Sequence, residues 1–244
     1  MLNMRTIREI SYKVDVSKES QRESLSLVFV ADTHIGSGMT RNGVEKLVQK
    51  VNEQKPEIIV LGGDIFDENT TQSLKDYTSE EFKKLNASEG VYYIEGNHEP
   101  RLKEDYTEYF TKAGITVLQD QIAFLPDGLQ IVGLRDSVDS KKISVEKIMD
   151  SVDREKPVLV LTHRPKQLEE LRRAGADVVL CGHTHGGQYP LGFLAILAAN
   201  DMNYGLKKFD TMSAITTSGA GGYGIPSKLT VPSEIVKINI RFNQ

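Results

Sequence analysis

Histidine and aspartate residues occur in this chain in short clusters of the kind that bind metal ions. Asp-x-His stands at Asp32–His34, Gly-Asp at Gly63–Asp64, and Gly-Asn-His-Glu at Gly96–Glu99. An isolated His163 and a Gly-His-Thr-His-Gly-Gly run at Gly182–Gly187 complete the series. Imidazole nitrogens with carboxylate and amide oxygens suit Mn, Fe, Zn or Co, whereas a structural zinc knot would use thiolates. Donors in this number, sharing one bridging residue, would serve two metal ions.

Each cluster also has an ordinary structural reading. Asp-x-His or Gly-Asp after a strand commonly marks a solvated loop, a turn or a helix cap, and a lone His163 could be a buried, hydrogen-bonded histidine. The Gly-Asn-His-Glu and Gly-His-Thr-His motifs are more specific, because a plain turn does not require histidine. All five histidines of the chain lie in this ordered series, which no structural role explains.

The elements that must position these clusters are short apolar runs. Each cluster directly follows one of five predicted strands: Leu25–Ala31, Ile58–Leu61, Val91–Ile94, Val158–Leu161 and Val178–Leu180. Ligand sites of α/β sheets usually lie at the carboxyl ends of their strands, so we expect the clusters to meet there. Helical spacing predicts five helices: Val44–Val51, Leu74–Leu85, Leu102–Phe110, Ile143–Val152 and Gln167–Arg173. Further strands are predicted at Ile115–Leu118, Ile122–Leu125, Leu129–Leu134, Ser213–Thr217 and Ile235–Ile240.

This alternation predicts an α/β fold with helices outside and a mixed or double sheet inside. Since no repeat or Pro/Ser-rich linker interrupts the 244 residues, we expect a single domain over residues 1–244. The least regular stretch, Gly187–Asp210, includes an apolar segment, Leu191–Ala199. That segment is either core or a patch that makes peripheral contact with a membrane.

Composition excludes several classes of protein. The chain is 39% hydrophobic and 26% charged, which is typical of a globular protein rather than a disordered one. One cysteine excludes an intramolecular disulfide framework, and a net charge of −4 argues against a broadly basic nucleic-acid surface. No apolar run approaches the ~20 residues that span a bilayer, and Met1–Val16 lacks a signal-peptide core. We expect a cytoplasmic protein, or a membrane-associated or exported one if an upstream segment has been removed.

The ordered motifs resemble those of the calcineurin-like metallophosphoesterase superfamily. The run Gly182–Gln188, the glycine-rich Gly219–Gly224 and the segment Pro232–Ile235 further resemble its bacterial YkuE/YaeI-like phosphohydrolase branch. The resemblance implies a four-layer α/β/β/α sandwich of two mixed sheets flanked by helices. It implies two metal sites, one of Asp32, His34, Asp64 and His185, the other of Asp64, Asn97, His163 and His183.

Two further roles follow from the resemblance. His98 is not a ligand but points toward the substrate, where it protonates the leaving oxygen or stabilises phosphoryl charge. Asp67 stands where the protein-phosphatase branch keeps an aspartate that orients this histidine. Purple acid phosphatases have a ligand tyrosine at the position of Asp67, so a Tyr–Fe(III) centre is not expected. Glu68–Asn69 replace the Arg-Gly that protein phosphatases carry next, which weakens a phosphoprotein reading.

The implied function is a binuclear metal-dependent phosphohydrolase that cleaves a phosphomonoester or phosphodiester by attack of a metal-bridging hydroxide. The cofactors would be two divalent ions, Mn, Fe or Zn, with Mn expected to support activity in vitro. Two such ions carry four positive charges, whereas Asp32 and Asp64 supply only two negative charges. The site would therefore be positive overall, and an acidic protein could still bind a phosphate ester there. The substrate would be a small-molecule or lipid-linked phosphate ester, and the oligomeric state stays open.

Two other functions compete with this one. A non-catalytic binding module on the same fold would usually have lost ligands or the equivalent of His98, and this chain keeps them all. A nuclease would usually carry a basic groove or an added DNA-binding domain, for which 244 residues at net charge −4 leave little room. Nucleic acid is therefore not an expected partner.

Overall fold

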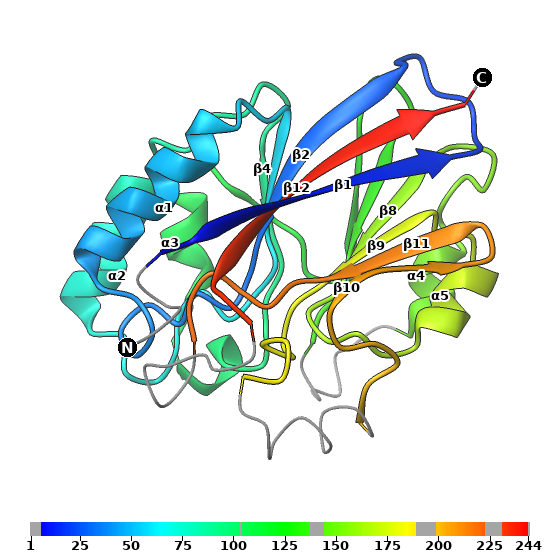
Figure 1. The fold of residues 1–244 in the computed structure, drawn as a ribbon. Helices are drawn as coiled ribbons and strands as arrows, with labels where there is room; N and C mark the ends of the chain where they lie inside the picture. Colours follow the sequence, from blue (N-terminus) through cyan, green and yellow to red (C-terminus); the bar gives the residue numbers. More distant parts are fainter. Residues whose placement is uncertain (1–5, 103, 137–143, 189–198, 223–230, 244) are drawn as a thin grey trace.

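The structure, a computed structural model, describes residues 6–102, 104–136, 144–188, 199–222 and 231–243. Two six-stranded mixed sheets form its centre, and helices lie on the outer side of each sheet (Figure 1). The sequence prediction of an α/β fold built from two mixed sheets with flanking helices is confirmed.

The first sheet has the strand order β1-β12-β2-β3-β4-β5. Its strands are β1 (Arg8–Val16), β2 (Ser24–Val30), β3 (Ile58–Leu61), β4 (Val91–Tyr93), β5 (Thr116–Val117) and β12 (Glu234–Phe242). Strands β2 to β5 run parallel, while β12 pairs antiparallel with β2 and parallel with β1. The parallel strands β2, β3 and β4 are the ones that must deliver the first three polar clusters.

The second sheet has the strand order β10-β11-β9-β8-β7-β6. Its strands are β6 (Gln121–Phe124), β7 (Gln130–Gly133), β8 (Val158–Leu161), β9 (Val178–Cys181), β10 (Gly205–Phe209) and β11 (Met212–Thr216). The four inner strands are parallel, and the antiparallel β6 and β10 form the two edges. Strands β8 and β9 are continuously buried, as expected of parallel strands covered on both faces.

Helices cover the outer face of each sheet. They are α1 (Arg41–Glu53), α2 (Gln72–Phe82), α3 (Thr107–Thr111), α4 (Val145–Met149) and α5 (Leu168–Arg173), with a 3-10 turn η1 (Glu99–Leu102). Figure 1 shows α1, α2 and α3 on the first sheet and α4 and α5 on the second. Three apolar clusters fill the spaces between helices and first sheet, between the two sheets, and between second sheet and helices. These layers are the α/β/β/α sandwich that the resemblance implied.

Some elements differ from the sequence prediction. The helix predicted over Leu102–Phe110 is shorter and begins later, as α3, and η1 ends where that prediction begins. The Thr107 N–H donates to Oδ1 of Asp105 at 3.1 Å, a local turn contact just before α3. Strands β1 and β10 were not predicted, because both are sheet edges whose side chains are largely exposed. Among the described residues no helix has the length and apolarity to cross a bilayer. The segment Leu191–Ala199 lies, except for its last residue, outside the described residues.

Candidate metal centre

The five polar clusters meet at one edge of the sandwich. They follow β2, β3 and β4 in the first sheet and β8 and β9 in the second. All five strands end at this edge, so residues more than 150 positions apart come into contact, as the 3.2 Å between Nε2 of His34 and Nε2 of His185 shows. The convergence at strand ends that the sequence predicted is therefore present in the structure.

One group of ligand atoms comes from Asp32, His34 and His185. The atoms lie within 4.8 Å of one another, which is close enough for all three to reach one metal ion. Nε2 of His185 is 3.7 Å from Oδ1 of Asp32. The side chains of Asp32 and His34 are fully buried, so no bulk water competes for their lone pairs.

A second group consists of Asp64, His163 and His183, again within 4.8 Å of one another. Nε2 of His163 is 3.1 Å from Oδ2 of Asp64, and the same carboxylate oxygen is 3.8 Å from Nε2 of His34. Asp64 therefore lies between the two groups, where a bridging ligand would have to lie. Nδ1 of His163 is 2.8 Å from the carbonyl oxygen of Gly62, a contact that leaves Nε2 directed at the centre.

The remaining predicted ligand, Asn97, leaves its amide oxygen available. That oxygen is buried and has no hydrogen-bond partner among the residues that the structure describes. A buried unpaired carbonyl oxygen costs free energy unless something positive lies against it. The predicted set of the two groups above and Asn97 consists of nitrogen and oxygen donors, which would fit divalent Mn, Fe or Zn.

The electrostatics of the centre favour a cation. Burial lowers the pKa of His163, but the carboxylates of Asp64 and Asp32 outweigh this effect and hold the pKa well above its ordinary value. Burial and the positive charges of His163 and Arg164 lower the pKa of His183 to about 3, so this imidazole is neutral at pH 7. A neutral imidazole is the form that ligates a metal, so His183 needs no proton loss, whereas a metal ion at His163 would replace the proton that the buried carboxylates favour there.

The backbone at the ligands adopts an uncommon conformation. Positive φ angles occur at five of the predicted ligands: Asp32 (52°), His34 (44°), Asp64 (51°), His183 (71°) and His185 (50°). Non-glycine residues adopt this left-handed region rarely, and its appearance at several ligands turns each side chain out of its strand toward a common point.

Glu99 holds two of these turns together. Its carboxylate accepts hydrogen bonds from the N–H groups of Ile65 at 2.6 Å, Gly96 at 2.8 Å and Asp64 at 3.0 Å. The side chain is completely buried, so the loop after β3 and the loop after β4 are fixed relative to each other. The resemblance places Glu99 beside the ligand residues and not among them, at a position where the bacterial branch often carries aspartate, and the structure adds its contacts with these two turns.

The neighbourhood of His98 differs from what the resemblance implied. Nδ1 of His98 lies 2.9 Å from Oε2 of Glu68. Oδ2 of Asp67, in contrast, lies 3.7 Å from Nδ1 of His34, and its Oδ1 accepts from the Asn69 N–H at 2.9 Å. Among the described contacts, the acid at Nδ1 of His98 is Glu68, while Asp67 faces a predicted metal ligand, His34.

Arg164 lies next to the second ligand group. Its Nε is 3.2 Å from Oδ2 of Asp136, and 29% of its side chain is exposed. The guanidinium is close enough to lower the pKa of His183, so it adds positive potential at the mouth of the centre. The Arg164 guanidinium therefore forms an ion pair with Asp136 and is only partly solvated.

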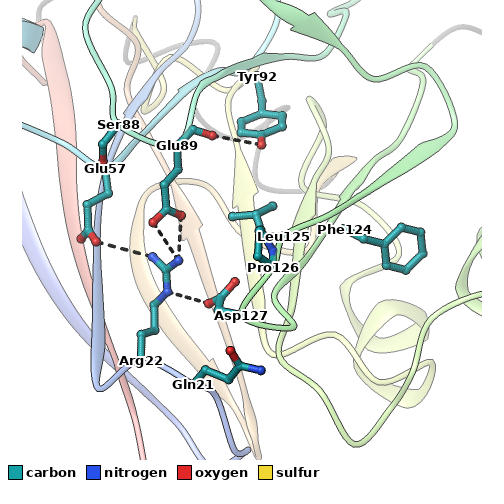
Figure 2. Close-up of a pocket in the computed structure, with 10 residues that line it drawn as sticks. All are labelled: Gln21, Arg22, Glu57, Ser88, Glu89, Tyr92, Phe124, Leu125, Pro126 and Asp127. Carbon is teal, nitrogen blue, oxygen red and sulfur yellow. Dashed lines mark hydrogen bonds and ion pairs between the residues drawn. The ribbon is translucent and has the colours of Figure 1, made fainter.

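A cavity of about 670 Å³ lies at the opposite edge of the sandwich, where β2, β3 and β4 begin. Figure 2 shows Arg22 there, surrounded by three carboxylates. Its guanidinium lies 2.5 Å from Asp127, 2.8 Å from Glu89 and 3.5 Å from Glu57. Because these acids already neutralise Arg22, the cavity offers a phosphate no free positive charge, and we do not assign the chemistry to it.

The sequence and fold both have known relatives. A sequence model of the calcineurin-like phosphoesterase family matches residues 25–187. A metallophosphoesterase of Helicobacter pylori is 30% identical over 89% of this chain and 60% of its own length. Phosphodiesterase YaeI of Escherichia coli is 31% identical over 82% of this chain and 76% of its own length. The crystal structure of TT1561 from Thermus thermophilus has a TM-score of 0.57 at 10% identity, covering 80% of this chain and 90% of that one.

The length of the relatives also matters. This chain spans about 60% of the length of the first curated relatives that it matches. Relatives from Danio rerio and Bos taurus are named as transmembrane proteins with a metallophosphoesterase domain.

Proposed function

Because this chain belongs to the calcineurin-like phosphoesterase family, we propose that it hydrolyses phosphate esters with two divalent metal ions. One observation carries the proposal: Asp and His side chains from five strand ends converge into three overlapping groups, Asp32–His34–His185, His34–Asp64–His98 and Asp64–His163–His183, with Asp64 in two of them. When bound, the ions would activate a water molecule and neutralise charge on the phosphoryl oxygens.

Different residues of this chain would bind the two metal ions and support the ligands. Asp32, His34 and His185 would hold one ion, Asn97, His163 and His183 the other, and Asp64 both. The carbonyl of Gly62 orients His163, and Glu99 fixes the turns that carry Asp64 and Asn97.

His98 is left to act on the substrate. Its Nε2 faces the donor set at 3.9 Å from Oδ2 of Asp64, and its ring packs edge to face on His34. From this position a proton on Nε2 would reach the leaving oxygen of a phosphate ester, or stabilise its charge. Removal of a positioned acid typically slows turnover by about 10²–10⁴-fold, most for esters with poor leaving groups.

We test the proposal with an aryl phosphate and a bis-aryl phosphate, each with Mn²⁺, Fe²⁺ and Zn²⁺. The diester is examined first, because a relative is named a phosphodiesterase. Hydrolysis with Mn²⁺ that disappears in Asp64→Asn, together with near two metals per chain, supports the proposal. His98→Ala should keep both metals and lose turnover. Metal-loaded protein that hydrolyses neither ester would instead favour a binding module.

A related hydrolysis assay would identify the class of substrate. A phosphate-release screen over monoesters, diesters, nucleotides and lipid phosphates identifies the class, and a small or lipid-linked ester is our proposal. Single-stranded DNA with Mn²⁺ serves as the nuclease arm, and we expect it to stay intact. We further propose that residues 1–244 act as one domain, a view supported by the apolar cluster between the sheets, which draws on strands from β1 to β12.

A further inference from the structure

His98 has a neighbour that the predicted catalytic set does not use. Oε2 of Glu68 lies 2.9 Å from Nδ1 of His98, and Oε1 of the same carboxylate accepts from Nη1 of Arg101 at 3.1 Å. The three side chains form a line that starts at the surface, where 53% of the Arg101 side chain is exposed. The line ends at the imidazole of His98, of which 7% is exposed.

Asp67, the residue that the family pattern would place against His98, is engaged elsewhere. Its own N–H donates to Oγ1 of Thr70 at 2.9 Å, which together with the Asn69 contact fixes the turn. These bonds direct the carboxylate of Asp67 toward His34. Nδ1 of His98 is therefore within hydrogen-bond distance of Glu68 and not, in the described contacts, of Asp67.

The charge state of Glu68 decides which nitrogen of His98 carries the proton. Partial burial raises the pKa of Glu68, but hydrogen bonds from His98 and Arg101 outweigh this effect and lower the pKa to about 2. An ionised carboxylate only accepts hydrogen bonds, so Nδ1 of His98 must be the donor. The orientation of Nε2 toward the donor set then follows from the rigid geometry of the ring.

We propose that Glu68 is a positioning residue: it accepts a hydrogen bond from the Nδ1–H of His98 and so directs Nε2 at the substrate, and Arg101 orients Glu68. The neutral ring then carries its proton on Nδ1, and the ring acts as an acid when Nε2 carries a second proton, which would pass to the leaving oxygen while the Nδ1–H bond to Glu68 is kept. The proposal rests on the proposed function for its kinetic consequence, but not for the geometry of His98. The ring of His34, edge to face with that of His98 at 5.0 Å between centroids, supports the imidazole from another side.

The kinetic test compares Glu68→Ala, Glu68→Gln and the matched surface variant Glu80→Ala. Glu80 is an exposed glutamate of α2 that pairs only with Lys83 among the contacts described. We expect Glu68→Ala to lower kcat by about 10- to 100-fold, part of the contribution of a general acid, with KM within about twofold. Glu68→Gln keeps an acceptor oxygen and should recover part of the loss in kcat. The kcat of Glu80→Ala should equal that of the native chain, and the number of bound metal ions should be the same in all variants.

A double variant makes the kinetic test sharper. If Glu68 acts through His98, adding Glu68→Ala to His98→Ala should cause no further loss, because the two residues form one unit. Additive losses would show that Glu68 acts independently and would overturn the proposal. Loss of bound metal in Glu68→Ala would also overturn it, since Glu68 would then support the centre and not the acid.

A readout that needs no activity separates this inference from the proposed function. In metal-free protein with ¹⁵N-labelled histidine, the His98 signals are assigned by their absence in His98→Ala. We expect the Nδ1–H tautomer in the native chain and its loss in Glu68→Ala. An Nε2–H tautomer, or no change in the variant, overturns the positioning role. If no ester is hydrolysed but the tautomer behaves as expected, only the proposed function fails.

Discussion

Substitution of Gly96 by alanine tests whether metal binding depends on the position of Asp64, the residue proposed to bind both metal ions. An ideal Cβ on Gly96 would lie 2.2 Å from Oδ1 of Asp64 and 2.5 Å from its backbone nitrogen. Ordinary contact begins at 3.4 Å, so the carboxylate or the loop must move by 1.2 Å, the difference between these two distances. Metal–ligand distances tolerate deviations of only about 0.2 Å.

The expected displacement is therefore several times larger than a ligand can absorb. Loss of a single supporting hydrogen bond typically costs about 10- to 100-fold in metal affinity, and Asp64 itself would be displaced here. We expect Gly96→Ala to bind Mn²⁺ at least about 100-fold more weakly, which corresponds to about 2.7 kcal/mol. Overpacking should also lower the free energy of unfolding by about 1–3 kcal/mol.

The assay is isothermal titration of metal-free protein with Mn²⁺, with thermal unfolding of the same samples. Gly114→Ala is the control, because, apart from the two neighbouring residues in the chain, no atom of the described residues lies within 4 Å of a Cβ built at that position. Its φ of +78° means a modest cost in stability without an effect on metal binding. If Gly96→Ala bound Mn²⁺ within about threefold of the native chain, the inferred contact between Gly96 and Asp64 would be refuted.

Three further predictions follow from the structure. Mn²⁺ at 100 times its Kd should raise the free energy of unfolding by about 2.7 kcal/mol, seen as an EDTA-reversible rise in Tm that is absent in Asp64→Asn. Arg22→Met leaves the carboxylates of Glu89 and Asp127 without their shared partner, and should lower Tm by about 4–8 °C, or about 2 kcal/mol. The exposed pair of Arg241 with Asp15 is the control, since Arg241→Met should cost less than about 1 kcal/mol, and equal losses would contradict the reasoning. Burial raises the pKa of the fully buried Cys181 thiol, so a thiol reagent should label the native chain at least about 10³-fold more slowly than the chain in denaturant. Rapid labelling of the native chain would show that β9 opens locally.

The centre of the fold was predictable because its signals are local. Continuous apolar runs such as Ile58–Leu61 and Val158–Leu161 can only be buried strands at that length, and the polar residues directly after them must lie at the sheet edge. This reasoning alone predicts that the clusters converge. The division of the ligands between two ions, in contrast, depended on the resemblance to a known superfamily.

Other features depend on contacts that no local pattern reports. Strand β1 pairs with β12, so Arg8 lies beside Glu234, and nothing in either segment alone specifies that register. The choice between Asp67 and Glu68 as the neighbour of His98 depends on turn hydrogen bonds to Asn69 and Thr70. Adjacent acids in one loop look equivalent in a sequence, and only the backbone decides which carboxylate faces which histidine.

The positive φ angles at the metal centre set stability against activity. Left-handed backbone at a histidine costs about 1–2 kcal/mol relative to glycine, and His34, His183 and His185 all adopt it. A change such as His185→Gly would therefore relax the metal-free chain while it removes a ligand. A lineage freed from selection for catalysis would gain folding free energy by discarding these histidines. If the proposed function holds, metal binding keeps these three histidines in the chain at the expense of folding free energy.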